Sequence, residues 1–344
     1  MNIALTGGGT AGHIMPNIAL LEDLNNSFDK IYYFGQPNSM EEKLLKDKNV
    51  EFIPIKAVKF NRQNLFSNIK IPFLIPNCIF SAYKQLKRLN VDVAFAKGGY
   101  ISLPLIFAAK LLRIPIICHE SDSTLGLANK VALPITNLLI TSYKDTSKNK
   151  KSVFIGNPLR KEIFSGDSNY IKYKYNINNN LPILLIVGGS LGAQAINELI
   201  YNSLDVLANY YNIVHITGLN YEKINKPNYY QETFINNIQD YIASADIIIS
   251  RCGANMSGEL TALNKRVLYV PLSNKASRGD QIDNARKLEE NNYAKVLNEE
   301  DLNIGNLMNA LEEVRFMQKN KYYYDTQIPT KIVNLIKNVA LSKK

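Results

Sequence analysis

Short apolar runs alternate with longer helix-like stretches along most of the chain. This alternation predicts βαβ units, which build a parallel sheet covered by helices. In the first half the runs predict strands over Asn2–Thr6, Lys30–Phe34, Glu51–Ile55, Val91–Ala96, Ile114–Cys118, Asn137–Thr141 and Ser152–Ile155. In the second half they predict strands over Leu181–Val187, Asn212–Thr217, Asp246–Ser250, Arg266–Val270 and Ala294–Leu297, with helices such as Ala193–Leu207 and Gln281–Glu290 between them. The pattern predicts an α/β chain of two Rossmann-like halves with parallel sheets.

Each half opens with the same arrangement, an apolar run that ends in glycines and leads into a helix. The first is Ile3–Leu5 before Gly7-Gly8-Gly9, and the second is Leu184–Val187 before Gly188-Gly189. Backbone N–H groups at such a helix N-terminus carry partial positive charge and can hold part of a phosphorylated ligand. We therefore expect the functional site in the cleft between the halves.

The boundary between the halves is expected at Gly156-Asn157-Pro158, because glycine followed by X-Pro suits a chain that crosses between domains. The expected domains are residues 1–157 and 158–325, followed by a C-terminal helix over 326–344 that can return to the N-terminal domain.

Composition narrows the class of protein. A chain of 344 residues with 46% hydrophobic residues can fill two cores. Cys78, Cys118 and Cys252 are too few and too far apart for a disulfide framework or a Cys-x-x-Cys metal site, and no apolar run is long enough to span a bilayer. These features predict a protein of the cytoplasm.

The formal net charge of +10 favours an acidic partner, either nucleic acid, an anionic membrane or a phosphorylated small molecule. Biased residue usage explains the same charge equally well. Because the Lys and Arg residues are scattered and no recognised binding motif appears, we expect no nucleic-acid partner.

The first glycine loop fits Gly-x-Gly-x-x-Gly at Gly7, Gly9 and Gly12, but the next strand ends in Gly35-Gln36 without the acidic residue that binds a ribose. A nicotinamide or flavin cofactor is therefore not expected, and the loop more plausibly admits a substrate. His13 follows at the helix start, where it is either a packing or capping residue or a group that faces the site.

Three loops of the first half end strands in polar or glycine residues, and ligands bind at that edge of open α/β sheets. They are Gly7 to His13, Gly98-Gly99-Tyr100 and His119-Glu120-Ser121-Asp122. In the second half, N–H groups near Ala254 and the Ser190 hydroxyl suit a diphosphate, and Glu259 can accept from ribose hydroxyls. The alternative for Glu259 is a solvated helix residue.

Together these residues resemble the MurG family of glycosyltransferase family 28, the N-acetylglucosaminyltransferases that convert lipid I to lipid II in bacterial cell-wall synthesis. The resemblance covers nearly the whole chain. It rests on Gly7-Gly8-Gly9-Thr10-Ala11-Gly12-His13, Gly98-Gly99-Tyr100, His119-Glu120, Gly156-Asn157-Pro158-Leu159-Arg160, Gly188-Gly189-Ser190, Arg251-Cys252-Gly253-Ala254 with Glu259, and Asp280-Gln281 with Asn284.

The resemblance implies the GT-B fold, with the donor UDP-GlcNAc held mainly by the C-terminal domain and lipid I by the N-terminal one. By position, it implies Glu259 at the ribose, Ser190 and Arg160 at the diphosphate, the backbone near Phe234 and Ile235 at the uracil, and Gln281 at the sugar hydroxyls. It adds Thr10, Gly12, Asp122, Ala254 and Asp280 to the donor site, and Gly8, Gly9, Gly99 and Tyr100 to the acceptor loops.

The chain also departs from the family pattern at Ala11, at Ser121-Asp122 and at Asp280. The family commonly has glycine at the first of these positions, Gln-Asn at the second and glutamine at the third. A carboxylate accepts from a sugar hydroxyl but cannot donate as an amide does, so Asp122 and Asp280 must make different contacts.

The family reaction is an inverting displacement that needs one base, for which we favour His13 and keep Glu120 as the second candidate. Arg160, Ser190 and the helix start near Ala254 would stabilise the departing UDP. No Asp-x-Asp motif stands at a strand end, so neither a metal nor a cofactor is expected.

Lipid I lies in the membrane, and the segment Lys59–Arg88 mixes apolar and basic side chains as interfacial segments do. We expect it to bind the cytoplasmic face of the cell membrane peripherally. The expected contacts are Phe66, Ile69, Lys70, Phe73 and Leu74, with Pro72 and Pro76 interrupting any long helix. The alternative is that Phe73–Ile75 and Ile79-Phe80 belong to the core.

Three other functions fit parts of the pattern. Another GT-B enzyme, such as a diacylglycerol glycosyltransferase or a UDP-sugar epimerase, would share the fold and donor site. A catalytically inactive sensor would bind UDP-GlcNAc without turnover, and a nucleic-acid-binding protein would show a steep dependence of affinity on salt.

Overall fold

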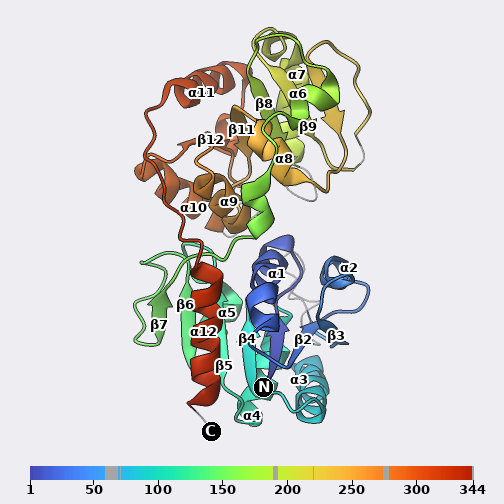
Figure 1. Ribbon diagram of the computed structural model, residues 1–344, viewed down its shortest axis with the longest axis vertical. Helices are drawn as coiled ribbons and strands as arrows, with labels where there is room; N and C mark the ends of the chain where they lie inside the picture. The colour runs from blue at the N-terminus through green and yellow to red at the C-terminus, as the bar shows by residue number, and fades with distance from the viewer. Residues whose placement is uncertain (59–68, 70, 189–192, 220, 274–278, 343–344) are drawn as a thin grey trace. The chain divides into compact units, whose positions relative to one another are not determined.

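The computed structural model describes residues 1–58, 69, 71–188, 193–219, 221–273 and 279–342. The chain forms two compact units (Figure 1). Unit 1 contains Met1–Arg160 together with Asp325–Lys344, and unit 2 contains Lys161–Tyr324. No helix among the described residues is both long enough and apolar enough to cross a membrane.

Unit 1 is built on a parallel sheet whose described strands run in the order β3-β2-β1-β4-β5-β6-β7. The strand order reverses between β1 and β4, which makes their carboxyl ends the expected place for a ligand. Its strands are β1 (Asn2–Thr6), β2 (Lys30–Gly35), β3 (Glu51–Pro54), β4 (Val93–Ala96), β5 (Ile116–Glu120), β6 (Leu138–Thr141) and β7 (Ser152–Phe154). Its helices are α1 (Ala11–Asn25), α2 (Met40–Leu45), α3 (Ile71–Arg88), α4 (Ser102–Leu111), α5 (Leu127–Ala132) and α12 (Ile328–Leu341).

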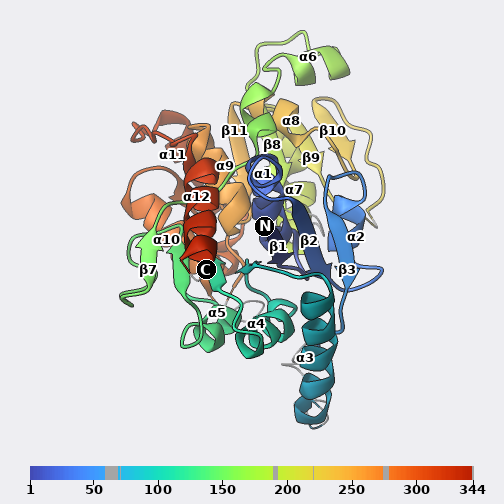
Figure 2. The same cartoon turned by 60° about the horizontal axis from the view of Figure 1, so that its bottom comes forward.

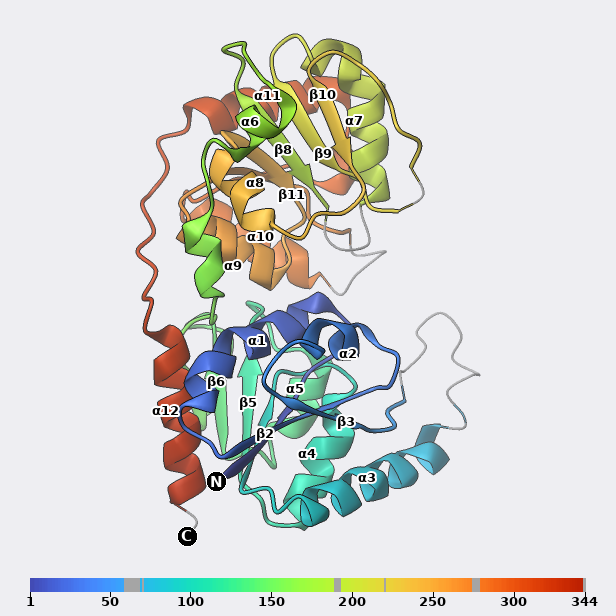
Figure 3. The same ribbon diagram turned by 45° about the vertical axis from the view of Figure 1, so that its right-hand side comes forward.

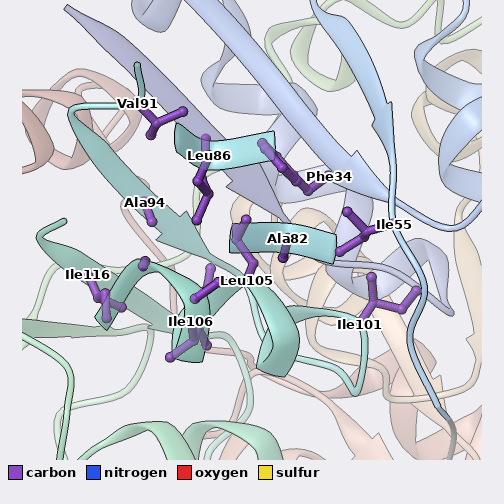
Figure 4. Close-up of a cluster of buried hydrophobic side chains, with 14 of the residues drawn as sticks. Phe34, Ile55, Ala82, Leu86, Val91, Ala94, Ile101, Leu105, Ile106 and Ile116 are labelled. Atoms are coloured by element: carbon purple, nitrogen blue, oxygen red, sulfur yellow. The ribbon is translucent and has the colours of Figure 1, made fainter. Parts of the chain in front are cut away.

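One face of this sheet is covered by a row of helices in which α4 lies between α3 and α5 (Figure 2). Buried side chains fill the space between sheet and helices (Figure 4). Phe34 and Ala94 come from strands, while Leu86 from α3 and Leu105 from α4 pack onto them. The alternation of strand side chains turns neighbours such as Leu5 to the opposite face.

The last helix of the chain, α12, belongs to unit 1, where it packs against α1 (Figure 1). Its apolar stripe includes Ile332 and Ile336, both fully buried. On its exposed side, the Thr330 hydroxyl donates to Asp23 of α1 over 2.9 Å. The chain therefore passes into unit 2 and returns before unit 1 is complete.

Helix α3 corrects one expectation. Pro72 and Pro76 do not interrupt it, because the helix continues over 18 residues from Ile71 to Arg88 (Figure 3). Pro72 lies in the first turn, where N–H groups have no intrahelical partner. Pro76, the sixth residue of the helix, lacks the N–H that would bond to the Pro72 carbonyl, so the helix loses one bond there and continues.

Unit 2 repeats the architecture with a parallel sheet whose described strands run β10-β9-β8-β11-β12-β13. Its strands are β8 (Ile183–Val187), β9 (Asn212–Ile216), β10 (Tyr229–Glu232), β11 (Ile247–Ser250), β12 (Arg266–Tyr269) and β13 (Lys295–Val296). Its helices are η2 (Lys161–Ser165), α6 (Tyr170–Tyr175), α7 (Gln194–Leu207), α8 (Ile238–Ser244), α9 (Ala254–Ala262), α10 (Asp280–Glu290), η3 (Glu299–Asp301) and α11 (Ile304–Phe316). The order again reverses at one point, between β8 and β11.

The apolar runs predicted every strand of both sheets except β10. This edge strand has the sequence Tyr-Tyr-Gln-Glu and lacks a continuous apolar run, so its pairing with β9 could not be read from hydrophobicity. Edge strands are buried less than central ones and carry a weaker signal.

The interior of unit 2 holds a neutral histidine. His215 on β9 is fully buried; its Nε2–H donates to Asn197 Oδ1 over 2.9 Å, and its Nδ1 accepts from the Tyr229 hydroxyl over 3.0 Å. Burial lowers the pKa of His215 to about 3. The unfolded chain, with an ordinary pKa of 6.5, therefore takes up this proton more readily than the folded chain does.

We expect the free energy of unfolding to fall as the pH drops from 6.5 towards 3, with up to ~1.4 kcal/mol per pH unit from His215. His215→Gln keeps an N–H donor but takes up no proton. It should therefore reduce the dependence of the unfolding free energy on pH by the contribution of about one proton. Urea unfolding followed by circular dichroism from pH 5 to pH 8 measures the difference. Equal slopes in the two proteins would contradict the assignment.

Candidate active site

The first glycine loop, between β1 and α1, is closely packed against neighbouring parts of unit 1. A Cβ atom at Gly7 would lie 2.7 Å from both the His13 carbonyl oxygen and Lys97 Cβ. At Gly8 it would lie 2.6 Å from a carboxylate oxygen of Glu41. Real Cβ contacts are longer than this, so only glycine fits at Gly7, while a side chain at Gly8 would require the Glu41 carboxylate to move.

The second glycine turn follows β4 and lies against the first loop. A Cβ atom at Gly99 would lie 2.9 Å from the Gly8 carbonyl oxygen and 3.5 Å from His13 Nδ1, and the φ of +79° also favours glycine. Tyr100 continues this contact, since a Cβ at Gly9 would lie 3.1 Å from the Tyr100 ring. The structure thus brings together Gly8, Gly9, Gly99, Tyr100 and His13.

His13 lies in the first turn of α1 and is half-buried. Its Nδ1 is 3.0 Å from the Thr10 hydroxyl, and its backbone N–H donates to the Thr10 carbonyl over 3.1 Å. Thr10 occupies the N-cap position without capping the helix through its side chain. The Thr10 hydroxyl instead contacts the imidazole ring and so helps to orient it.

The third loop, after β5, is organised by Glu120, which is only 6% exposed. Its carboxylate accepts from the backbone N–H groups of Asp122 at 3.2 Å and Gly126 at 2.8 Å, and from the side chain of Asn129 at 2.9 Å. The carbonyl of Asp122 accepts from Thr146 Oγ1 over 3.2 Å. Glu120 therefore acts as an internal acceptor that fixes the position of Asp122.

A second buried carboxylate, Glu41 of α2, was not identified from the sequence. It is 1% exposed and accepts from the Gln36 N–H at 3.2 Å and, more weakly, from the Gly9 N–H at 3.5 Å. The Tyr100 hydroxyl donates to Gln36 Oε1 over 2.7 Å, and burial followed by the Glu41 charge raises the pKa of Tyr100. An acid does lie near the end of β2, but it binds the protein's own backbone.

A buried amine was also missed. Lys97, the first residue after β4, is 2% exposed, and its Nζ contacts His119 Nδ1 and Ser121 Oγ. His119 Nε2 in turn lies 3.2 Å from the Gly156 carbonyl oxygen. The position of Lys97 directly before a glycine pair at a strand end was the available signal, but burial of a side chain is a tertiary property.

In unit 2, helix α9 begins at Ala254. Its N-cap residue is Gly253, so no side chain caps the helix. The first turn contains no acidic residue, and a Cβ at Gly253 would meet nothing within 4 Å. Glu259 on the same helix is 5% exposed, so the alternative of a solvated residue is wrong. Ser190 lies outside the described residues.

The loop after β12 is held by Arg251 and Glu299. Arg251 donates to the carbonyls of residues 270 and 271 at 3.0 and 3.2 Å and to Glu299 at 2.6 Å. Burial acts to raise the pKa of Glu299, but hydrogen bonds from Arg251 and the Ser273 N–H outweigh it and keep the pKa below its usual value. Gln281 Oε1 accepts from a backbone N–H of this loop at 3.1 Å.

The remaining expected site residues are distributed over both units. Asp280, the first residue of α10, and Arg160, the last residue of the first segment of unit 1, are both half-buried. Ile235 packs against the core of unit 2, whereas its neighbour Phe234 is 64% exposed.

Helix α3 presents apolar side chains to solvent. Phe73 is 79% exposed, Leu74 44%, and Ile69, just before the helix, 66%. The alternative that these residues form core is wrong, as it is for the exposed Ile75 and Phe80, whereas Ile79 does pack against the core. Phe66 and Lys70 lie outside the described residues.

Two family patterns match the chain. Residues 3–137 match the glycosyltransferase family 28 N-terminal domain, and residues 183–339 match the family 28 C-terminal domain. The chain is also 39% identical, over 98% of its length and 97% of the relative, to the UDP-N-acetylglucosamine--N-acetylmuramyl-(pentapeptide) pyrophosphoryl-undecaprenol N-acetylglucosamine transferase of Clostridium botulinum. The chain belongs to glycosyltransferase family 28. Its identity to the transferase of the same name from Clostridium novyi is 40%, over 93% of this chain and 92% of that one.

Solved structures agree with the fold of this family 28 chain. MurG of Acinetobacter baumannii matches it with a TM-score of 0.76 and 25% identity, over 98% of this chain and 99% of the other. UDP-GlcNAc 2-epimerase from Neisseria meningitidis matches with a TM-score of 0.65 at 15% identity over 100% of both chains, a likeness of fold alone. The expected GT-B fold is confirmed.

Gly12 offers a test of ligand approach in this family 28 site. Among the described residues, a Cβ there would meet only the Thr10 hydroxyl, at 3.5 Å, so these neighbours do not require glycine. We expect Gly12→Ala to keep or raise the free energy of unfolding, by up to ~1 kcal/mol, while raising the KM for the donor because the methyl group obstructs the ligand.

The matched control is Gly305→Ala, at the second residue of α11, the position that Gly12 holds in α1. It should change stability similarly and leave KM unaltered. Thermal unfolding and initial-rate kinetics on the two variants make the comparison; a normal KM in Gly12→Ala would remove Gly12 from the site.

Proposed function

We propose that this chain transfers N-acetylglucosamine from UDP-GlcNAc to the C4 hydroxyl of the N-acetylmuramyl residue of lipid I, undecaprenyl-pyrophosphoryl-MurNAc-pentapeptide, and so forms lipid II. The observation that carries the proposal is the 39% identity, over 98% of the chain, to a transferase named for this reaction. The arrangement of polar groups in each unit supports it.

Unit 2 would hold the nucleotide. The Glu259 carboxylate, shielded from water, suits the ribose hydroxyls, because an acceptor in a low-dielectric position binds a donor more strongly than a solvated one. The N-terminus of α9 at Ala254 would receive the diphosphate, assisted by Ser190 and Arg160. The backbone at Ile235 would read the uracil.

The donor sugar would meet a mixed set of acceptors and donors. Gln281 uses its oxygen for a backbone contact, and its NH2 group makes no hydrogen bond within the described part of the chain, so it can donate to a sugar hydroxyl. Asp280 and Asp122 would accept from hydroxyls. Thr10 and Gly12 would complete this side at the first glycine loop.

His13 is the better candidate for the base. Thr10 contacts its ring and the Gly99 turn lies beside it, whereas the Glu120 oxygens already accept three hydrogen bonds. To act on the substrate, this carboxylate would have to give up contacts that organise its own loop. We therefore assign Glu120 a positioning role.

The reaction is a single displacement. The acceptor C4 oxygen attacks the anomeric carbon, the bond from that carbon to the UDP oxygen breaks, and UDP leaves with the bonding electron pair. His13 takes the hydroxyl proton, and attack from the opposite face inverts the configuration to β. Arg160, Ser190 and the α9 N-terminus would stabilise the charge that develops on UDP.

Helix α3 would bring the enzyme to its lipid acceptor at the cytoplasmic face of the cell membrane. Its buried side, with Ala82 and Leu86, packs on unit 1, and Phe73 and Leu74 are exposed. Lys84 lies over the Phe80 ring at 4.4 Å, which places a positive charge beside an exposed aromatic side chain. This mixture suits an interface with anionic lipid.

The function is tested by transfer of labelled GlcNAc from UDP-GlcNAc to a lipid I analogue, with a chelator present and diacylglycerol as a second acceptor. We expect product from lipid I alone. Product from diacylglycerol alone would replace this proposal with another GT-B activity, and loss of product on adding chelator would show that a metal takes part.

Two variants test the roles within the same assay. His13→Ala should lower kcat by about 10²- to 10⁴-fold. Glu259→Ala should raise the donor KM by about ten- to a hundredfold, the effect of losing a hydrogen bond to a charged group. Glu312→Ala, an exposed glutamate on α11, is the matched control and should change neither quantity. Near-normal turnover in folded His13→Ala would shift the base to another group.

Membrane binding is tested with vesicles of phosphatidylglycerol and phosphatidylcholine. Phe73→Ser should weaken vesicle binding by about tenfold, since burial of a Phe side chain contributes ~1.5–3 kcal/mol when complete. Tyr173→Ser removes a similarly exposed aromatic residue, 74% exposed on α6 of unit 2, and should bind as the wild type does. Equal loss in both variants would argue against α3.

A further inference from the structure

The Lys97 amine lies at the point where unit 1's site elements meet. Its backbone N–H donates to the Thr6 carbonyl over 2.8 Å, which joins the ends of β4 and β1. Its Cβ lies below Gly7, and the side chain is 2% exposed. Among the described residues it forms no ion pair with a carboxylate, so its presence in the core is not explained by a salt bridge.

In each hydrogen bond around Lys97, the donor and the acceptor can be assigned. His119 Nε2 faces the Gly156 carbonyl at 3.2 Å and must carry the hydrogen, because a carbonyl can only accept. His119 Nδ1 therefore has a lone pair and accepts from the Lys97 amine. Burial first, and then the Lys97 charge, lower the pKa of His119 well below its ordinary value, in agreement with a neutral ring. The Ser121 hydroxyl accepts a second bond.

Both ends of this network lead directly to groups that face the proposed site. Lys97 is followed by Gly98 and Gly99, and a Cβ at Gly99 would lie 3.5 Å from His13 Nδ1. Ser121 is followed by Asp122, whose backbone N–H is held by Glu120. One amine thus connects the turn that lies beside the His13 ring with the segment that carries Asp122.

We propose that Lys97 is a positioning residue for the transfer reaction. By donating to His119 and Ser121, it fixes the Gly98-Gly99 turn beside His13 relative to the segment that presents Asp122. This inference depends on the proposed function, because positioning is defined by the reaction that it serves. Lys97 itself, enclosed below the loop, does not touch the substrate.

The energetics separate positioning from structural support. Burial lowers the pKa of Lys97 to about 7 against the opposing charges of Glu120 and Asp122, so the folded protein bears a penalty for holding the protonated amine. Below pH 10.5 that penalty grows as the pH falls towards 7, since the unfolded chain then binds the proton more readily. An apolar side chain of equal length relieves the penalty.

The experiment is kinetics and thermal unfolding of Lys97→Met in the full-length protein. We expect kcat for transfer to a lipid I analogue to fall by about ten- to a hundredfold, because displaced reacting groups slow the step. The midpoint of unfolding should stay the same or rise. UDP affinity, measured by calorimetry, should be unchanged because its proposed contacts lie outside this network.

Two further variants sharpen the test. Ser121→Ala should lower kcat less than Lys97→Met does, and the double variant should be no slower than Lys97→Met, because the shared contact is already lost. Lys265→Met is the matched control. Its amine donates to the carbonyls of Ala243 and Ala245 at 2.8 and 3.0 Å in unit 2, so it should lower the midpoint and leave kcat unchanged.

Wild-type kcat in Lys97→Met would overturn the positioning role while leaving the proposed function intact. A fall in kcat that only follows a lower unfolding midpoint, or additive effects of the two substitutions, would overturn it as well. Failure of the wild-type protein to transfer GlcNAc to lipid I would instead overturn the proposed function, and the positioning role with it.

Discussion

At the carboxyl edge of the unit 1 sheet, the backbone of the loop after β1 lies close to that of the loop after β4. This close approach determines which residues fit in both loops. The sheet order makes β1 and β4 neighbours, so the loops that follow them must share one space. Gly8 and Gly99 meet there with no allowance for a Cβ atom, which would lie 2.9 Å from the carbonyl oxygen opposite. The His13 ring lies beside this approach, and the buried side chains of Lys97 and Glu41 lie next to the same loop.

Hydrophobic patterning predicted the strands well because parallel strands are buried on both faces and read as continuous apolar runs. The same reasoning missed β10, whose polar edge sequence leaves no such run. It also misjudged Pro76, because a proline near a helix start removes a single bond and the packed face of α3 compensates. Element positions were therefore predictable, while the tolerance of one helix for proline depended on tertiary packing.

Candidate site residues could be proposed from the sequence where glycine spacing or a helix start marks a loop, as at His13 and Ala254, and their roles stay predictions. Lys97 and Glu41 were not, because the sequence does not reveal whether a charged side chain points into the interior or into solvent. For Phe73 the sequence favoured an exposed position but left the core as an alternative, which its 79% exposure excludes. Side-chain direction, rather than backbone class, marks the limit of prediction here.

Some of the positively charged side chains bind carbonyl groups of the protein itself. Arg266 donates to the carbonyls of Val314 and Arg315, at 2.9 and 2.6 Å, and so caps the C-terminus of α11. Lys265 does the same for α8. Cations in these positions offset the negative end of a helix dipole. A basic composition thus overstates the charge available to any acidic partner.

Because α12 completes unit 1, all of unit 2 is inserted in the sequence between Arg160 and Asp325. During synthesis, all of unit 2 therefore leaves the ribosome before α12 does. At that stage the apolar side of α1 is not yet covered by α12 residues such as Ile332 and Ile336. Unit 1, which is synthesised first, is thus the last unit to complete its core. A nascent or prematurely terminated chain would carry an intact unit 2 attached to an open, aggregation-prone unit 1.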